Sequence, residues 1–255
     1  MQHDTGSRRR RRVTTITAVR VLGAGAAGLL AAWVVGQYRF DGRLPERANR
    51  SEPPTAKTAS GRPRPVDIPS VQIAVAGGAT RGDPASPLAL VNYSDFDCPF
   101  CRKFATATLP ELDRAFVSNG RLLIVFKHLP IGSLHPRARE KARLAVCANR
   151  HGKFWDVHDA LFALKTGGSV EDMSSLAKSV GLGGNSLLQC MAEPSSLEAV
   201  EGDLSDARSF GIAGTPTFFV GRLDHGVVSA SKLISGAQPT AVFISLIEEL
   251  LQAAR

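Results

Sequence analysis

The stretch Cys98-Pro99-Phe100-Cys101 constrains the fold of this chain more than any other feature of its sequence. Residues 88–93, just before it, form a short apolar run bounded by turn residues, which is typical of a strand. From Cys98 to about Val117, apolar residues recur at helical spacing. The two cysteines therefore lie where a strand passes into a helix, with Cys101 one turn after Cys98 on the same helix face.

The start of a helix is a favourable place for a reactive cysteine. Backbone N–H groups without helical partners and the positive end of the helix dipole lower the pKa of a thiol there, and the thiolate is the nucleophile in disulfide exchange. We expect Cys98 to be accessible and to attack, or be attacked by, a substrate sulfur, with Cys101 resolving the mixed disulfide. Pro99 suits the first helical turn, because it lacks only an N–H that the helix leaves free.

Two other interpretations of the cysteine pair are half of a zinc site and two buried core thiols. A zinc site needs a second ligand pair, but Cys147 and Cys190 stand alone, with no C-x-x-C or H-x-x-x-H beside them. His151 and His158 lie near Cys147 in sequence and are interpreted as helix-surface or core residues. A C-x-x-C among strand and helix patterns favours redox chemistry, so we predict no metal ligands here.

The basic charge of the chain is confined to its N-terminal part. A net charge of +8 is compatible with a nucleic-acid partner. However, residues 1–66 hold 13 Lys/Arg against 4 Asp/Glu, whereas residues 67–255 hold 18 against 19. The predicted folded part has no basic excess to attract phosphates, so we predict no nucleic-acid partner.

Residues 1–38 are predicted to be a basic cytoplasmic tail followed by a membrane segment. Five arginines at positions 8–12 precede an apolar stretch, and its uncharged part, residues 21–38, has 18 residues, close to the length of a membrane span. An uncleaved signal anchor fits this length and the lack of a clear cleavage site. A cleaved secretory signal and a buried core helix are the alternatives. The anchor and the cleaved signal both deliver the following domain across a membrane.

The rest of the chain divides into a linker and a mixed domain. Residues 39–66 are rich in proline and polar residues, which predicts a disordered linker. Further strands are predicted at residues 71–76, 121–128, 217–220 and about 227–234, and helices at residues 137–149, 153–164, 170–180, 186–191, 196–210 and about 239–251. This order predicts an α/β domain over residues 67–255, with a helical insertion at about 136–210.

Several of these segments together resemble one known family. Residues 91–101 resemble the active-site strand and helix of DsbA-like thioredoxin-fold proteins, and residues 214–218 resemble the loop in which those proteins place a cis-proline beside the cysteines. Residues 151–155 and 159–162 resemble their helical insertion. The resemblance extends over about residues 67–252 and implies a thioredoxin-like fold.

The resemblance also implies roles for individual residues. Pro216 would be cis, and Thr215 would offer its backbone to an extended substrate segment beside the cysteines. The Cys98–Cys101 disulfide would itself be the redox group, so no organic cofactor or metal is expected. Some relatives carry a bridge in the insertion, and nearby buried thiols tend to join in an oxidising compartment. We therefore favour a structural Cys147–Cys190 disulfide over two free thiols.

Phe100 is the informative departure from the family pattern. The strongest oxidants of the family carry His at this position, and Phe cannot stabilise the Cys98 thiolate by charge or by hydrogen bonding. We therefore predict a pair that is less oxidising than a Cys-Pro-His-Cys version.

The sequence as a whole predicts a membrane-tethered, extracytoplasmic thiol–disulfide oxidoreductase of the bacterial cell envelope. It would act on cysteines of unfolded or partly folded exported proteins, most simply as an oxidase, and a membrane redox partner would reset its cysteines. A reductase or isomerase using the same site is one alternative, although residues 40–66 are too short and polar for the dimerisation domain of a V-shaped isomerase. A non-catalytic substrate-binding or chaperone module is the other.

Overall fold

The computed structural model describes residues 65–164, 168–183 and 185–253. The predicted tail and membrane segment, residues 1–38, lie outside the described residues, as does nearly all of the predicted linker. Within the described ranges, no helix combines the length and the apolar content that crossing a bilayer requires.

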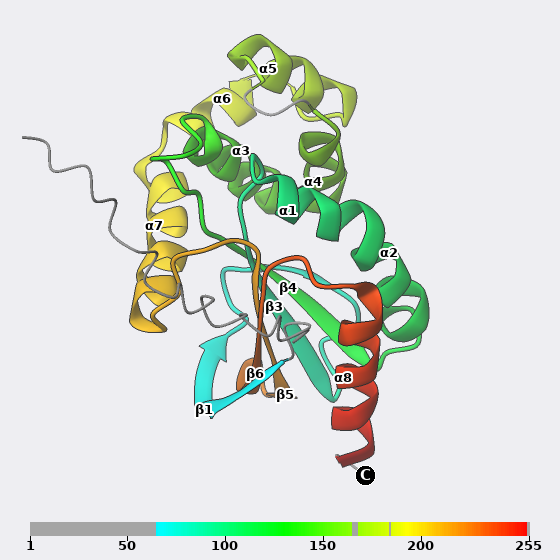
Figure 1. The fold of residues 1–255 in the computed structure, drawn as a ribbon. Helices are drawn as coiled ribbons and strands as arrows, with labels where there is room; N and C mark the ends of the chain where they lie inside the picture. Colours follow the sequence, from blue (N-terminus) through cyan, green and yellow to red (C-terminus); the bar gives the residue numbers. More distant parts are fainter. Residues whose placement is uncertain (1–64, 165–167, 184, 254–255) are drawn as a thin grey trace, which may run out of the picture. The chain divides into compact units, whose positions relative to one another are not determined.

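One mixed sheet is formed by the strands of the described chain, in the order β1-β6-β5-β3-β4-β2 (Figure 1). The strands are β1 (Val66–Ala74), β2 (Ala79–Arg81), β3 (Leu88–Ser94), β4 (Leu122–His128), β5 (Thr217–Asp224) and β6 (Val227–Ser235). The neighbouring interior strands β3 and β4 are parallel and buried along their whole length, while all other neighbouring pairs are antiparallel. The predicted thioredoxin-like α/β fold is therefore confirmed.

The helices fall into an active-site helix, an insertion and a C-terminal helix. The active-site helix alternates α and π turns as α1 (Pro99–Lys103), η2 (Phe104–Thr108), α2 (Leu109–Leu112) and η3 (Asp113–Val117). The insertion contains α3 (Ala138–Arg150), α4 (Phe154–Ala163), α5 (Val170–Ser179), α6 (Asn185–Ala192) and α7 (Pro194–Ser209), and α8 (Thr240–Ala253) ends the domain. Pro110 interrupts the helical hydrogen bonding because it has no N–H, which is one reason for wider turns beside it.

Alternating side chains of β3 pack in two different clusters, one on each face of the sheet. Leu88 and Leu90 pack with the active-site helix and with α8, where Phe243 is fully buried. Ala89, Val91 and Tyr93 pack on the other face, in a cluster that includes residues of α3 and α7. A third cluster fills the insertion and reaches the cysteines of the active-site helix. The active site thus lies where the sheet, the active-site helix and the insertion meet.

The structure corrects the predicted strands in two places. It adds β2, whose three residues are too few to show a periodic pattern, and it pairs β2 with β4 at the edge of the sheet. It also begins β1 at Val66, five residues before the predicted strand, because β1 continues past Pro69 through an irregularity between Asp67 and Val71. Proline is tolerated here because β1 is an edge strand.

Candidate active site

A tight turn after β3 places Cys98 at the start of the active-site helix. The peptide N–H of Cys98 donates to the carbonyl of Asp95 at 3.1 Å, and Cys98 is the N-cap of α1, with extended backbone angles (φ −73°, ψ 122°). Pro99 occupies the first turn, as predicted, and the N–H of Arg102 donates to the Cys98 carbonyl at 3.0 Å. Only 6% of Cys98 is exposed, so its side chain is more covered than we expected from the sequence.

The pKa values of the two thiols in this pair are shifted in opposite directions. The pKa of Cys98 is lowered to about 5, first by a hydrogen bond from the Cys101 thiol, and then by the side chain of Thr215 and by backbone N–H groups of the first helical turn. Burial raises the pKa of Cys101 well above its usual range, and the neighbouring Cys98 raises it further. One sulfur is therefore ready to react as a thiolate at neutral pH, while the other holds its proton.

The loop before β5 brings Thr215 and Pro216 to the cysteine pair. The Thr215–Pro216 peptide bond is cis, and the Cys98 Sγ lies 3.4 Å from the carbonyl oxygen of Thr215. The register of β3 against β5 pairs Tyr93 with Thr217, so this loop leaves the sheet beside the end of β3. Beside this loop lies a depression of about 370 Å³, lined by residues 210–217 together with Leu233, Ser235 and Gly236.

Phe100 is an exposed residue of the C-x-x-C stretch. It is 62% exposed, so its ring stands in solvent at the start of the helix. The ring offers apolar surface next to Cys98 and no hydrogen bond to its thiolate.

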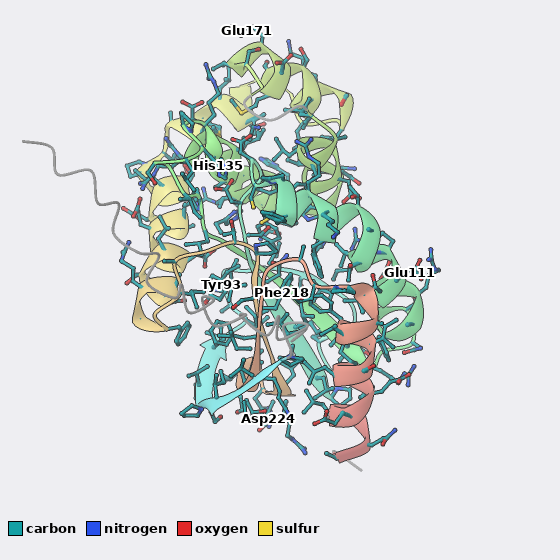
Figure 2. The ribbon with its side chains drawn as sticks, in the orientation of Figure 1. Tyr93, Glu111, His135, Glu171, Phe218 and Asp224 are labelled. Atoms are coloured by element: carbon teal, nitrogen blue, oxygen red, sulfur yellow. A yellow bond between two sulfur atoms is a disulfide. The ribbon has the colours of Figure 1, made fainter. Side chains whose placement is uncertain are left out.

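A buried polar network around the cysteines was missed by the sequence analysis. Lys141 of α3 pairs with Asp97, the residue before Cys98, at 2.5 Å, and both side chains are almost completely buried. The carboxylate of Asp95 accepts hydrogen bonds from the N–H groups of Asp97 and Ile131, both at 2.8 Å. His135, in the segment between β4 and α3 (Figure 2), lies 2.8 Å from the same carboxylate. These contacts fix the turn that carries Cys98 against the insertion.

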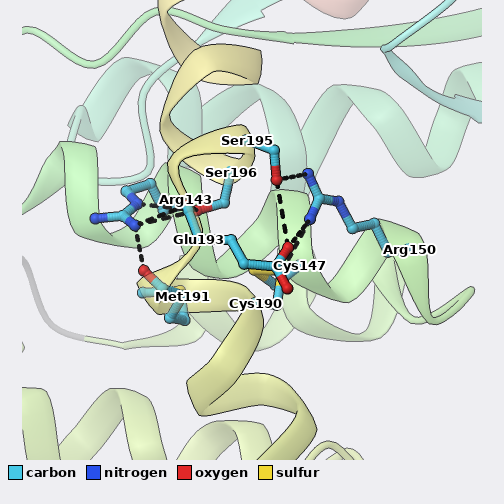
Figure 3. A network of polar contacts seen from close by, with 8 residues as sticks. All are labelled: Arg143, Cys147, Arg150, Cys190, Met191, Glu193, Ser195 and Ser196. Carbon is cyan, nitrogen blue, oxygen red and sulfur yellow. Dashed lines mark hydrogen bonds and ion pairs between the residues drawn. A yellow bond between two sulfur atoms is a disulfide. The ribbon is translucent and has the colours of Figure 1, made fainter.

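The other two cysteines form a disulfide within the insertion. Cys147 of α3 and Cys190 of α6 are joined at an S–S distance of 2.04 Å, and both are buried. Two arginines of α3 surround the bridge (Figure 3). Arg143 donates to the carbonyl of Met191 and to Ser196 Oγ, while Arg150 approaches Cys190 Sγ at 3.5 Å. The structure therefore separates the four cysteines into a thiol pair beside the loop of Pro216 and a bridge that joins α3 to α6.

Comparison with known proteins identifies relatives of this domain. A family model described as Thioredoxin matches residues 75–233. Among curated proteins, Na(+)/H(+) antiporter NhaA 1 of Mycobacterium sp. (strain KMS) is 37% identical over 157 residues, which are 60% of this chain and 25% of that protein. Na(+)/H(+) antiporter NhaA 3 of Salinispora tropica is 29% identical, over 82% of this chain and 30% of that protein. The chain thus spans about a quarter of the length of the curated relatives that it matches.

Several solved structures share the fold of this domain. Oxidised BdbD from Bacillus subtilis superposes with a TM-score of 0.62 at 22% identity, covering 73% of this chain and 100% of that one. Wolbachia pipientis alpha-DsbA1 gives a TM-score of 0.60 at 22% identity, covering 69% and 92%. A periplasmic thioredoxin-like protein from Salmonella enterica gives 0.56 at 23%, covering 69% and 91%. These likenesses confirm the predicted DsbA-like resemblance at the level of the fold.

Proposed function

Because the chain belongs to the thioredoxin family, we propose that it is a protein thiol–disulfide oxidoreductase. The observation that carries this proposal is the asymmetry of the cysteine pair at the helix start. Cys98 has a strongly lowered pKa and lies 3.4 Å from the carbonyl of Thr215, whereas Cys101 is buried behind it with a raised pKa. This division fits one sulfur that exchanges with substrates and one that resolves the mixed disulfide.

The reaction needs only the two sulfurs of the pair. A substrate thiolate attacks Cys98 of the Cys98–Cys101 disulfide, a mixed disulfide forms, and Cys101 leaves with the electron pair. A second substrate thiolate then attacks the substrate sulfur of the mixed disulfide, which forms the substrate disulfide and releases Cys98 as a thiolate. The substrate is oxidised, the pair is reduced, and no organic cofactor or metal takes part.

The substrates that we propose are unfolded or partly folded exported proteins with free cysteines. An extended segment can pair with the backbone of Thr215 while its sulfur meets Cys98, as in strand addition. The exposed ring of Phe100 adds apolar surface of the kind that unfolded chains contact. The domain acts outside the cytoplasm in the bacterial cell envelope, held by an N-terminal membrane anchor or released after cleavage of a signal, and a membrane redox partner reoxidises it.

A reductase or isomerase activity of the same site is the second candidate. Phe100 favours it, because the ring offers no charge or hydrogen bond to the Cys98 thiolate. A disulfide that is a weaker oxidant corresponds to a dithiol that more readily donates electrons to substrate disulfides. Cation antiport, the activity named for the curated relatives, is not carried to this chain, since the match spans about a quarter of those proteins.

Refolding of a reduced, disulfide-containing protein tests the proposal. Catalysed regain of activity should need Cys98, and a Cys98→Ala variant should lose at least a thousandfold in rate, because nothing replaces the attacking sulfur. Refolding that is assisted equally by wild type and Cys98→Ala would instead identify a non-catalytic binding module. The redox state of Cys98 and Cys101 in cells decides the direction: oxidised for an oxidase, reduced for a reductase or isomerase.

A further inference from the structure

Two buried hydroxyl groups near the cysteines have no hydrogen-bond partner among the described residues: Ser94 Oγ and Thr215 Oγ1. Polar atoms that are buried without a partner are uncommon in folded proteins, so each one needs an explanation. The side chain of Thr215 already acts on Cys98. The hydroxyl of Ser94 is left without an explanation, because it has no part in the exchange reaction described above.

The position of Ser94 directs its hydroxyl toward the active-site helix. Ser94 is the last residue of β3 and pairs with His128 of β4. Side chains of β3 alternate between the two faces of the sheet, so Ser94 lies on the same face as Leu88 and Leu90, which pack against the active-site helix. Only 2% of Ser94 is exposed, so water does not readily supply a partner.

The peptide N–H that follows Ser94 lies beside the sulfur of Cys101. The peptide N–H of Asp95 points at Cys101 Sγ at 3.5 Å. The side chain of Ser94 and this N–H both lower the pKa of Cys101, against the larger effect of burial. While Cys101 is a thiol, its proton is directed to Cys98; once that proton has left, the sulfur becomes a strong acceptor for both groups.

We propose that Ser94 is a catalytic residue whose hydroxyl donates a hydrogen bond to the Cys101 thiolate. This inference rests on the proposed disulfide exchange. Cys101 carries negative charge whenever it leaves the Cys98–Cys101 disulfide or attacks the mixed disulfide at Cys98. In the second case the Cys101–Cys98 bond forms, the Cys98–substrate bond breaks, and the substrate sulfur departs with the electron pair and takes up a proton from solvent.

The effect of the hydroxyl follows from the energetics of a buried thiolate. A hydrogen bond to a charged group in a dry site is stronger than one between neutral groups. Its loss raises the pKa of Cys101 and so decreases the thiolate fraction at neutral pH. The more basic thiolate is a somewhat better nucleophile, which offsets part of that decrease. We therefore expect Ser94→Ala to slow attack by Cys101 about three- to tenfold.

Stopped-flow reaction of the reduced full chain with a chromogenic aromatic disulfide separates the two sulfurs. Attack by Cys98 releases a first aromatic thiolate, and attack by Cys101 on the resulting mixed disulfide releases a second at a rate independent of reagent concentration. Ser94→Ala should leave the first phase unchanged, slow the second, and shift the pH midpoint of the second phase upward. Ser94→Thr, which keeps a hydroxyl, should restore the second phase.

Ser86→Ala is the matched control. Ser86 is also 2% exposed and its hydroxyl also lacks a partner among the described residues, but it precedes β3 at the end of the strand opposite the cysteines. A second phase that is unchanged in Ser94→Ala, or slowed equally in Ser86→Ala, would overturn the role of Ser94. If wild type itself shows no first phase, the failure lies with the proposed disulfide exchange.

Discussion

The two cysteine pairs of this protein share one chemistry and differ in their surroundings. Cys98 and Cys101 lie one turn apart at the start of one helix, beside a loop from a distant part of the chain, and their pKa values are shifted in opposite directions. Cys147 and Cys190 join two helices of the insertion and are enclosed by the side chains of α3 and α6. The comparison indicates that the acidity of Cys98 depends on the Cys101 thiol, the Thr215 side chain and the N–H groups of the helix start, whereas the other pair forms a bridge between two packed helices.

Removal of the Cys147–Cys190 pair should give the largest change in the free energy of unfolding. The bridge closes a loop with a sequence separation of 43, so Cys147→Ala/Cys190→Ala should lower the free energy of unfolding by about 4 kcal/mol. Urea denaturation measures this loss, and disulfide exchange by Cys98 should persist at low temperature. An unchanged urea midpoint, or free thiols in denatured, air-oxidised Cys98→Ala/Cys101→Ala, would contradict a stabilising bridge.

The ion pairs near the two cysteine pairs should also differ in strength. Lys141→Met removes the charge that balances the buried carboxylate of Asp97, and breaking such a pair costs about 3 kcal/mol or more. The pair of Arg150 with Glu193 near the Cys147–Cys190 bridge is partly exposed, so Arg150→Met should cost about 1 kcal/mol or less. Denaturation of both variants tests this, and equal losses would refute the contrast.

Among the cysteines of the reduced protein, Cys98 should give the pH dependence of stability below neutral pH, because the bridged cysteines do not titrate and the pKa of Cys101 is raised. The pKa of Cys98 is lowered to about 5 in the folded state, so the stability from its thiolate is complete above the pKa of the unfolded chain. This stability is lost as pH falls toward 5, with a slope of at most about 1.4 kcal/mol per pH unit. Alkylation of the reduced protein against pH should show this midpoint.

The variant Cys101→Ala tests the origin of the lowered Cys98 pKa, because the hydrogen bond from the Cys101 thiol is the largest cause of this lowering. The midpoint for alkylation of Cys98 should rise in this variant. A midpoint that stays unchanged would assign the acidity of Cys98 to the helix start alone.

The smallest expected effect concerns Phe100. A histidine at this position can stabilise the Cys98 thiolate, so Phe100→His should raise the reduction potential by about 30 mV, equivalent to about tenfold in the equilibrium constant. Redox equilibration with glutathione measures it. A wild-type potential equal to or above that of the variant would show that Phe100 does not limit the oxidising power of the pair.

The sequence predicts the parts of the fold that depend on local patterns. The apolar run of β3, the helix after Cys98 and the loop of Thr215 and Pro216 all have strong local signals, and the structure brings them together. The three residues of β2 have no such signal, since only pairing with β4 makes them a strand.

The buried ion pair at the active site shows why part of the site stayed hidden. A lysine in a helix usually lies in solvent, so Lys141 alone does not suggest burial. Yet it shares a helix face with Ala138, Ala142 and Ala145, all of them buried, and this spacing was a signal available in the sequence. That its partner is Asp97, 44 positions away, depends on how α3 packs against the turn before Cys98.

The insertion is tied to the sheet domain by two buried ion pairs, one from Lys141 to Asp97 and the other from Lys127 of β4 to Asp203 of α7. Because breaking either pair is costly, the insertion is not expected to lift away during a catalytic cycle. The flexibility needed to bring a cysteine to Cys98 must then come from the substrate. A protein that has finished folding no longer has this flexibility, so the substrates that fit the proposed function are proteins that have not finished folding.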